Sequence, residues 1–117
     1  MKLVRALLLL PLAIACSDSL FPADNLVGTW AGKFTVPGAS LVMALNQGGI
    51  DVGGTGTYAI EAGRSGTLQV IGTYERPTVR LTLHYDSGVD FAFVGTVTDQ
   101  SHMTGALGAN HLEFERR

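Results

Sequence analysis

The sequence has only one cysteine, few charged residues and no long apolar run beyond its first fifteen positions. Because Cys16 has no partner within the chain, no internal disulfide can stabilise the fold, and burial of apolar side chains has to do so. Only 15% of the 117 residues are charged, 8 of them basic and 10 acidic. The basic residues form no cluster that could hold a phosphate backbone. We therefore expect no nucleic acid among the partners.

The sequence also lacks the motifs of common catalytic and metal sites. No serine lies in a Gly-x-Ser-x-Gly elbow, and no helix pattern follows the glycines at 53–56 that could bind phosphate. His84, His102 and His111 do not have a spacing typical of metal ligands, and the aspartates occur where turns commonly use them. We expect a chain that is not an enzyme, with no catalytic residue, metal or cofactor.

The first fifteen residues have the pattern of an export signal. Basic residues at the start precede an uncharged apolar stretch at 6–15, which ends with the small residues Ala13 and Ala15 before Cys16. The stretch is about half of the ~20 apolar residues that a membrane-spanning helix needs. The sequence therefore predicts a helical signal peptide over 1–15, cleaved between Ala15 and Cys16.

The residues from Leu12 to Cys16 resemble the lipobox of bacterial lipoproteins. The resemblance implies that the Cys16 thiol receives a diacylglyceryl group and that fatty acyl chains, such as palmitate, then hold the protein on a membrane. An ordinary secretory signal cut at the same bond would leave Cys16 as a free thiol, a liability in an oxidising compartment. Ser17 after the cysteine, rather than Asp, resembles the lipoproteins sent to the outer membrane, which implies an exported protein of the cell envelope that faces the periplasm.

Residues 16–24 are predicted to form a flexible tether, because they are polar and interrupted by Pro22. The domain is placed at 25–117. In the domain apolar residues recur at every second position and no segment keeps a helical period over three turns, so the fold class is predicted to be all-β. Turn residues separate eight expected strands, at 26–36, 40–45, 52–60, 66–74, 78–85, 89–98, 102–107 and 111–116.

The expected strands can pair as an antiparallel up-and-down meander. A three-residue loop would place Leu83 opposite Phe91. A two-residue turn at 109–110 would place Gly105 opposite Phe114. In both pairs, the two residues belong to the same face of the sheet.

Glycines recur at inward positions, at Gly54, Gly56, Gly72, Gly95 and Gly105. Such glycines permit sharp bends and close approach of strands, so the eight strands should close into a small barrel and remove their open edges. A two-sheet β-sandwich is the alternative, because a hydrophobic pattern does not prove the order of pairing.

The first strand carries Gly28-Thr29-Trp30, and Arg116 occupies an inward position of the last. This combination resembles the calycin barrels, which include lipocalins, fatty-acid-binding proteins and avidins. The resemblance implies that Trp30 plugs one end of the barrel and that Arg116 is its cation–π partner, both in structural roles.

Two functions remain compatible with these features. The first is a membrane-anchored envelope lipoprotein whose solid barrel has a structural role or contacts other envelope proteins. The second is a lipocalin-like module that binds a small apolar ligand in a partly open interior. The residues that would line this interior are Phe34, Met43, Tyr58, Tyr74, Phe91, Phe93 and Met103. We expect the solid barrel, whereas a cavity of several hundred Å³ would favour binding.

Replacement of the cysteine tests the anchor. We expect Cys16→Ala to release the protein from the membrane fraction, because the variant has no thiol to carry the lipid, whereas Ser17→Ala should remain bound. Cell fractionation and mass spectrometry of the mature N-terminus measure both results. A Cys16→Ala protein that stays with the membranes would contradict the lipid anchor.

Overall fold

The computed structural model describes residues 21–34, 38–60 and 63–117. The signal peptide expected at 1–15, with its last residue Ala15, and Cys16, for which lipidation is expected, lie outside these residues. The strands of the described part are β1 (Gly28–Lys33), β2 (Ser40–Gly48), β3 (Asp51–Ile60), β4 (Arg64–Glu75), β5 (Thr78–Tyr85), β6 (Asp90–Val97), β7 (His102–Leu107) and β8 (Asn110–Arg116). Within the same residues, no helix has the length and apolar character needed to cross a bilayer.

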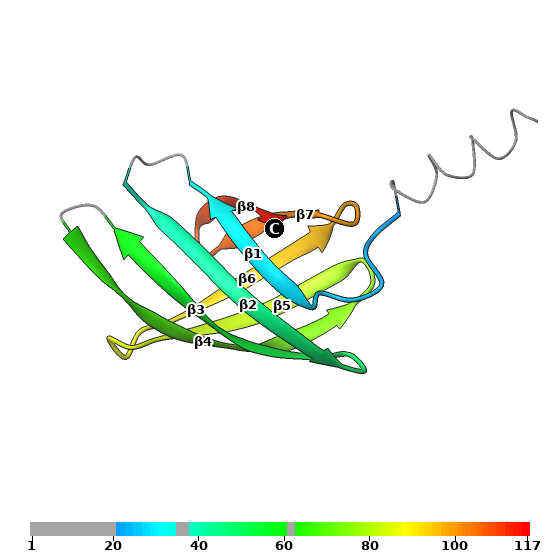
Figure 1. Ribbon diagram of the computed structural model, residues 1–117, viewed down its shortest axis with the longest axis horizontal. Coiled ribbons are helices and arrows are strands. Elements are labelled where there is room, and N and C mark those ends of the chain that lie inside the picture. The colour runs from blue at the N-terminus through cyan, green and yellow to red at the C-terminus, as the bar shows by residue number, and fades with distance from the viewer. Residues whose placement is uncertain (1–20, 35–37, 61–62) are drawn as a thin grey trace, which may run out of the picture.

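The strands form an antiparallel meander that closes on itself (Figure 1). Each strand pairs with the next along the chain, and β8 pairs with β1. The predicted all-β fold and closed barrel are confirmed, and the alternative of a two-sheet sandwich is wrong because the first and last strands are hydrogen-bonded to each other. Closure leaves no open sheet edge among the eight described strands.

In the observed strand register, side chains lie on the faces that the sequence predicts. At one hairpin, the residues that are paired across the strands differ from the predicted ones. Leu83 is opposite Phe91, as expected. In the last hairpin, however, Gly105 is opposite Leu112 rather than Phe114. The turn there uses Gly108, whose φ of 62° is the left-handed conformation that glycine adopts readily, and so it begins one residue earlier than expected. Because this changes each partner by two residues, every side chain keeps its predicted face.

The inward glycines allow neighbouring strands to approach closely. A Cβ atom at Gly54 would lie 2.0 Å from the carbonyl oxygen of Ala44, and one at Gly72 would lie 2.0 Å from that of Arg80. These distances are far too short for a non-bonded contact, so only glycine fits. The glycines therefore serve the bending of the sheet around the core.

The core lies inside the barrel and is fully apolar. Among the described residues no polar or charged side chain is buried. Within it the rings of Phe93 and Phe114 meet edge to face, with centroids 5.2 Å apart and planes at 90°. The largest fully buried side chains are Leu26, Trp30, Leu41, Met43, Leu83, Phe93, Met103, Leu112 and Phe114.

One end of the barrel, which we call the closed end, is covered by residues 21–27 before β1 (Figure 1). Trp30 is fully buried there, and its Nε1–H donates a 2.9 Å hydrogen bond to the carbonyl of Leu26. Ala23 is also buried, and its carbonyl accepts a 2.6 Å hydrogen bond from the hydroxyl of Tyr74. Although Ala23 falls within the tether that the sequence predicts, its packing makes it part of the barrel.

Arg116 completes the closed end. Its Cζ atom lies 4.6 Å from the centre of the Trp30 ring. Its Nη1 and Nη2 donate to the carbonyls of Val27 and Asn25, at 2.8 and 2.9 Å, and its Nε donates to that of Gln100 at 3.0 Å. The guanidinium therefore links the first strand, the entering segment and the turn between β6 and β7.

Candidate ligand-binding site

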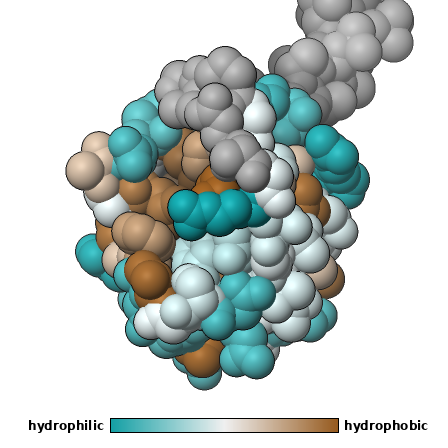
Figure 2. Space-filling model, turned by 90° about the vertical axis from the view of Figure 1, so that its left-hand side faces the viewer, coloured by the Kyte–Doolittle hydropathy of each residue, from teal (hydrophilic) through white to brown (hydrophobic). Residues whose placement is uncertain are grey.

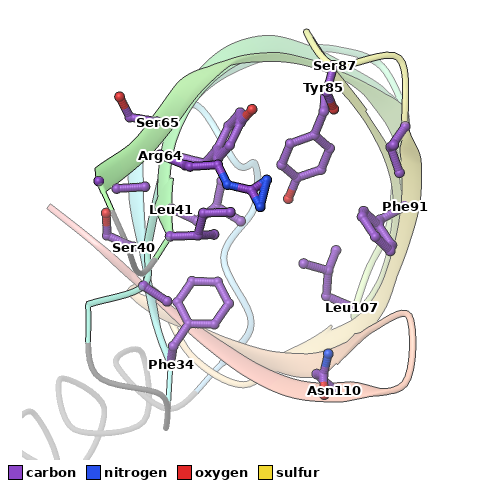
Figure 3. A pocket seen from close by; sticks show the side chains of 16 residues that line it. Phe34, Ser40, Leu41, Arg64, Ser65, Tyr85, Ser87, Phe91, Leu107 and Asn110 are labelled. Atoms are coloured by element: carbon purple, nitrogen blue, oxygen red, sulfur yellow. The ribbon is translucent and has the colours of Figure 1, made fainter.

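The other end of the barrel, which we call the mouth, is where β2, β4, β6 and β8 begin. It holds a cavity of about 690 Å³. Figure 2 views this end and shows hydrophobic residues within a recess bordered by hydrophilic ones. The lining residues are Phe34, Ala39, Ser40, Leu41, Tyr58, Ala59, Ile60, Gly63, Arg64, Ser65, Tyr85, Ser87, Val89, Phe91, Leu107 and Asn110 (Figure 3).

Aromatic side chains stand along one wall of the cavity. The rings of Tyr58 and Tyr85 meet edge to face at 4.8 Å, and those of Tyr85 and Phe91 do so at 5.6 Å. Phe91 occupies an inward position but is 44% exposed, because the cavity lies in front of it. This row offers a broad apolar surface to a small molecule.

Asp86 holds the first ring of this row in place. Its Oδ1 accepts a 2.9 Å hydrogen bond from the hydroxyl of Tyr58, and its Oδ2 accepts one of 2.9 Å from the backbone N–H of Thr67. The Asp86 N–H donates back to the Thr67 carbonyl. The bond from Thr67, followed by that from Tyr58, lowers the pKa of the Asp86 carboxyl from its ordinary value, and the same carboxylate raises the pKa of Tyr58. From the sequence, Asp86 is expected only to be one of the aspartates that form turns, because it precedes Ser87-Gly88.

Among the lining residues that the structure describes, Arg64 is the charged one. Figure 3 shows its guanidinium projecting from the start of β4 into the middle of the opening, on the side of Tyr85. A guanidinium carries five N–H donors in a planar arrangement and stays protonated at physiological pH. The mouth therefore combines an apolar wall with a set of hydrogen-bond donors.

The seven residues expected to line an interior divide between the mouth and the packed core. Phe34, Tyr58 and Phe91 line the cavity. Met43, Tyr74, Phe93 and Met103 are buried in the core and do not line it. The barrel is therefore packed with buried side chains below the mouth, whereas the mouth itself has an open cavity.

The histidines lie on the outer surface beside carboxylates. Nδ1 of His84 is 2.9 Å from Asp90, and His102 lies between Asp99 and Glu115, at 2.9 and 3.1 Å. The hydrogen bond with Asp99, and then that with Glu115, raises the pKa of His102. Within residues 21–34, 38–60 and 63–117, no three histidine, cysteine or acidic side chains are grouped so that they could hold a metal.

The titration of Asp86 tests the contact that fixes Tyr58. We expect the Asp86 carboxyl to titrate below 3.8, and Tyr58→Phe to raise its pKa towards that value because one hydrogen bond to the carboxylate is lost. Since the folded-state pKa is the lower one, the stability that Asp86 contributes is present above about pH 4 and is lost as the pH falls through its lowered pKa. NMR titration of the carboxyl carbon measures the shift. Tyr85→Phe is the control, and an Asp86 pKa at or above 3.8 in the parent would contradict the contact.

No protein-family model, curated protein or solved structure matches the chain. The eight-stranded antiparallel barrel is consistent with a calycin-like fold.

Proposed function

We propose that this protein is a lipid-anchored protein of the bacterial envelope whose barrel binds a small, largely apolar molecule in its mouth. The observation that carries the binding role is the cavity of about 690 Å³ with its row of aromatic side chains. Ligand pockets for small molecules typically have volumes of about 300 to 1,000 Å³, with mostly apolar linings and few polar groups. The mouth has both properties.

The lining indicates how the ligand lies. Its apolar body packs against Phe34, Tyr85 and Phe91, which line the same cavity. Phe34 directly follows β1, Tyr85 ends β5 and Phe91 belongs to β6. A hydrogen-bond acceptor at the outer end of the ligand would lie beside the Arg64 guanidinium and accept hydrogen bonds from it. A molecule with an apolar body and one polar end satisfies both features.

The filled closed end limits how deeply the ligand enters. Met43, Phe93 and Met103 are buried in the packed core below the mouth, so the molecule cannot pass through the barrel. It is held near the surface, with one side open to solvent. Such a site lets the molecule enter and leave from the aqueous side.

The anchor is supported by the sequence alone. The lipobox-like residues from Leu12 to Cys16 would place acyl chains on the new N-terminus, and Ser17 favours the outer membrane, on its periplasmic side. A structural role, or contact with other envelope proteins, is the other function that the sequence left open. The open, aromatic mouth favours ligand binding over that role.

A matched pair of substitutions in β6 tests the binding site. Phe91 lines the mouth and Val94 lies on the outer face, and they are 44% and 45% exposed. We expect Phe91→Asp to weaken binding of the uncharged fluorescent probe N-phenyl-1-naphthylamine by at least about tenfold, because it places a charge on the apolar wall. Val94→Asp should leave the affinity within about twofold of the parent value.

Fluorescence titration gives the affinities, and circular dichroism verifies that both variants are folded. If the parent does not bind the probe, or both variants bind it as the parent does, then the mouth is not a ligand site.

A further inference from the structure

Three large apolar side chains are exposed at the closed end. They are Phe21, Val27 and Ile50, at 57%, 46% and 50% exposure, and we call them the closed-end rim. Phe21 and Val27 belong to the segment that covers this end, and Ile50 lies in the turn between β2 and β3. None of them lines the mouth, so ligand binding does not account for their exposure.

The backbone that carries the rim is fixed by hydrogen bonds. The Leu26 N–H donates to Oε1 of Gln47, and Nε2 of Gln47 donates to the carbonyl of Gly49, which ties the segment before Val27 to the turn before Ile50. Nε2 of Gln100 donates to the Phe21 carbonyl at 3.0 Å. The three side chains are therefore held on the same end of a rigid barrel.

The length of the chain before Phe21 indicates what covers this rim. Cys16 precedes Phe21 by five residues. Even a fully extended chain of that length spans at most about 18 Å. With acyl chains on Cys16, the closed end would have to remain close to the bilayer surface.

The mouth is at the opposite end of the strands. A ten-residue strand such as β3 rises about 33 Å along its own direction. At a tilt of about 40° this is about 25 Å along the barrel axis. A bilayer that reaches the closed-end rim would therefore leave the mouth in solvent.

The charges near the rim are partly neutralised within the protein. Asp24 forms an ion pair with Arg76, and Asp99 with His102 when that histidine is protonated. Apolar side chains beside such paired charges suit the boundary between acyl chains and headgroups, where the charged groups remain hydrated.

We propose that the closed-end rim inserts into the surface of the phospholipid bilayer that holds the anchor, so that the barrel stands with its mouth directed away from the membrane. This orientation rests on the proposed lipid anchor at Cys16. It gives the closed end a second role beside the plug, and it keeps the binding site open to molecules in the aqueous space.

Tryptophan probes at three matched positions test the orientation. Ile50→Trp reports the rim, Val89→Trp the mouth and Val94→Trp the outer wall, and the parent residues are 50%, 48% and 45% exposed. The mature proteins are purified from membranes and placed in phosphatidylcholine vesicles whose acyl chains are brominated. Trp30 is fully buried in the parent protein, whose fluorescence supplies the background.

We expect bromine to quench most of the fluorescence added at position 50 and little of that added at 89 or 94. Phe21→Trp should behave as position 50 does. Equal quenching at 50 and 94, or stronger quenching at 89, would overturn the orientation. Absence of quenching at positions 50 and 21 would also overturn the orientation, and a protein partner would then be the better explanation for the exposed rim.

Mass spectrometry of the same samples distinguishes a failure of the proposed orientation from a failure of the proposed lipid anchor. An acylated N-terminus combined with unquenched probes overturns the orientation and leaves the anchor intact. A mature protein without acyl chains overturns the anchor and the orientation that rests on it.

Discussion

The contact between Trp30 and Arg116 is the constraint on which the rest of the barrel depends. The two residues are opposite each other where β1 meets β8, so their side chains join the first and last strands across the seam. The guanidinium satisfies carbonyl groups of the entering segment and of the turn before β7. Burial lowers its pKa, but an arginine remains charged, and its hydrogen bonds offset part of the desolvation cost.

The two ends of the barrel differ in whether a chain segment covers them. At the closed end, residues 21–27 cross the barrel and add Ala23 and Leu26 to the core. At the mouth, no segment of the described residues fills the corresponding space, and about 690 Å³ remains. Phe93 is therefore fully buried, whereas Phe91, two residues away on the same face of β6, lies at the cavity. A plug at one end and a cavity at the other are properties of one asymmetric barrel.

The alternation of apolar residues made most of the fold predictable. β5 and β7 have the predicted bounds, and the inward face is the predicted one, because a period of two residues determines on which side of a sheet each side chain lies. The same period carries no information on position along the barrel axis, so it could not separate Phe91 from Phe93. Nor could it find the partners of Asp86, since Thr67 and Tyr58 are 19 and 28 residues away along the chain.

Hydrogen–deuterium exchange of the Trp30 indole Nε1–H, followed by NMR, measures the stability of the closed end most directly. Because this group is buried and bonded to Leu26, and Arg116 covers the ring, we expect it to exchange only when the whole barrel unfolds, as slowly as the slowest amides of β3 and β4. An indole N–H that exchanges much faster than those amides would show that the closed end opens on its own, which contradicts the central role of the Trp30–Arg116 contact.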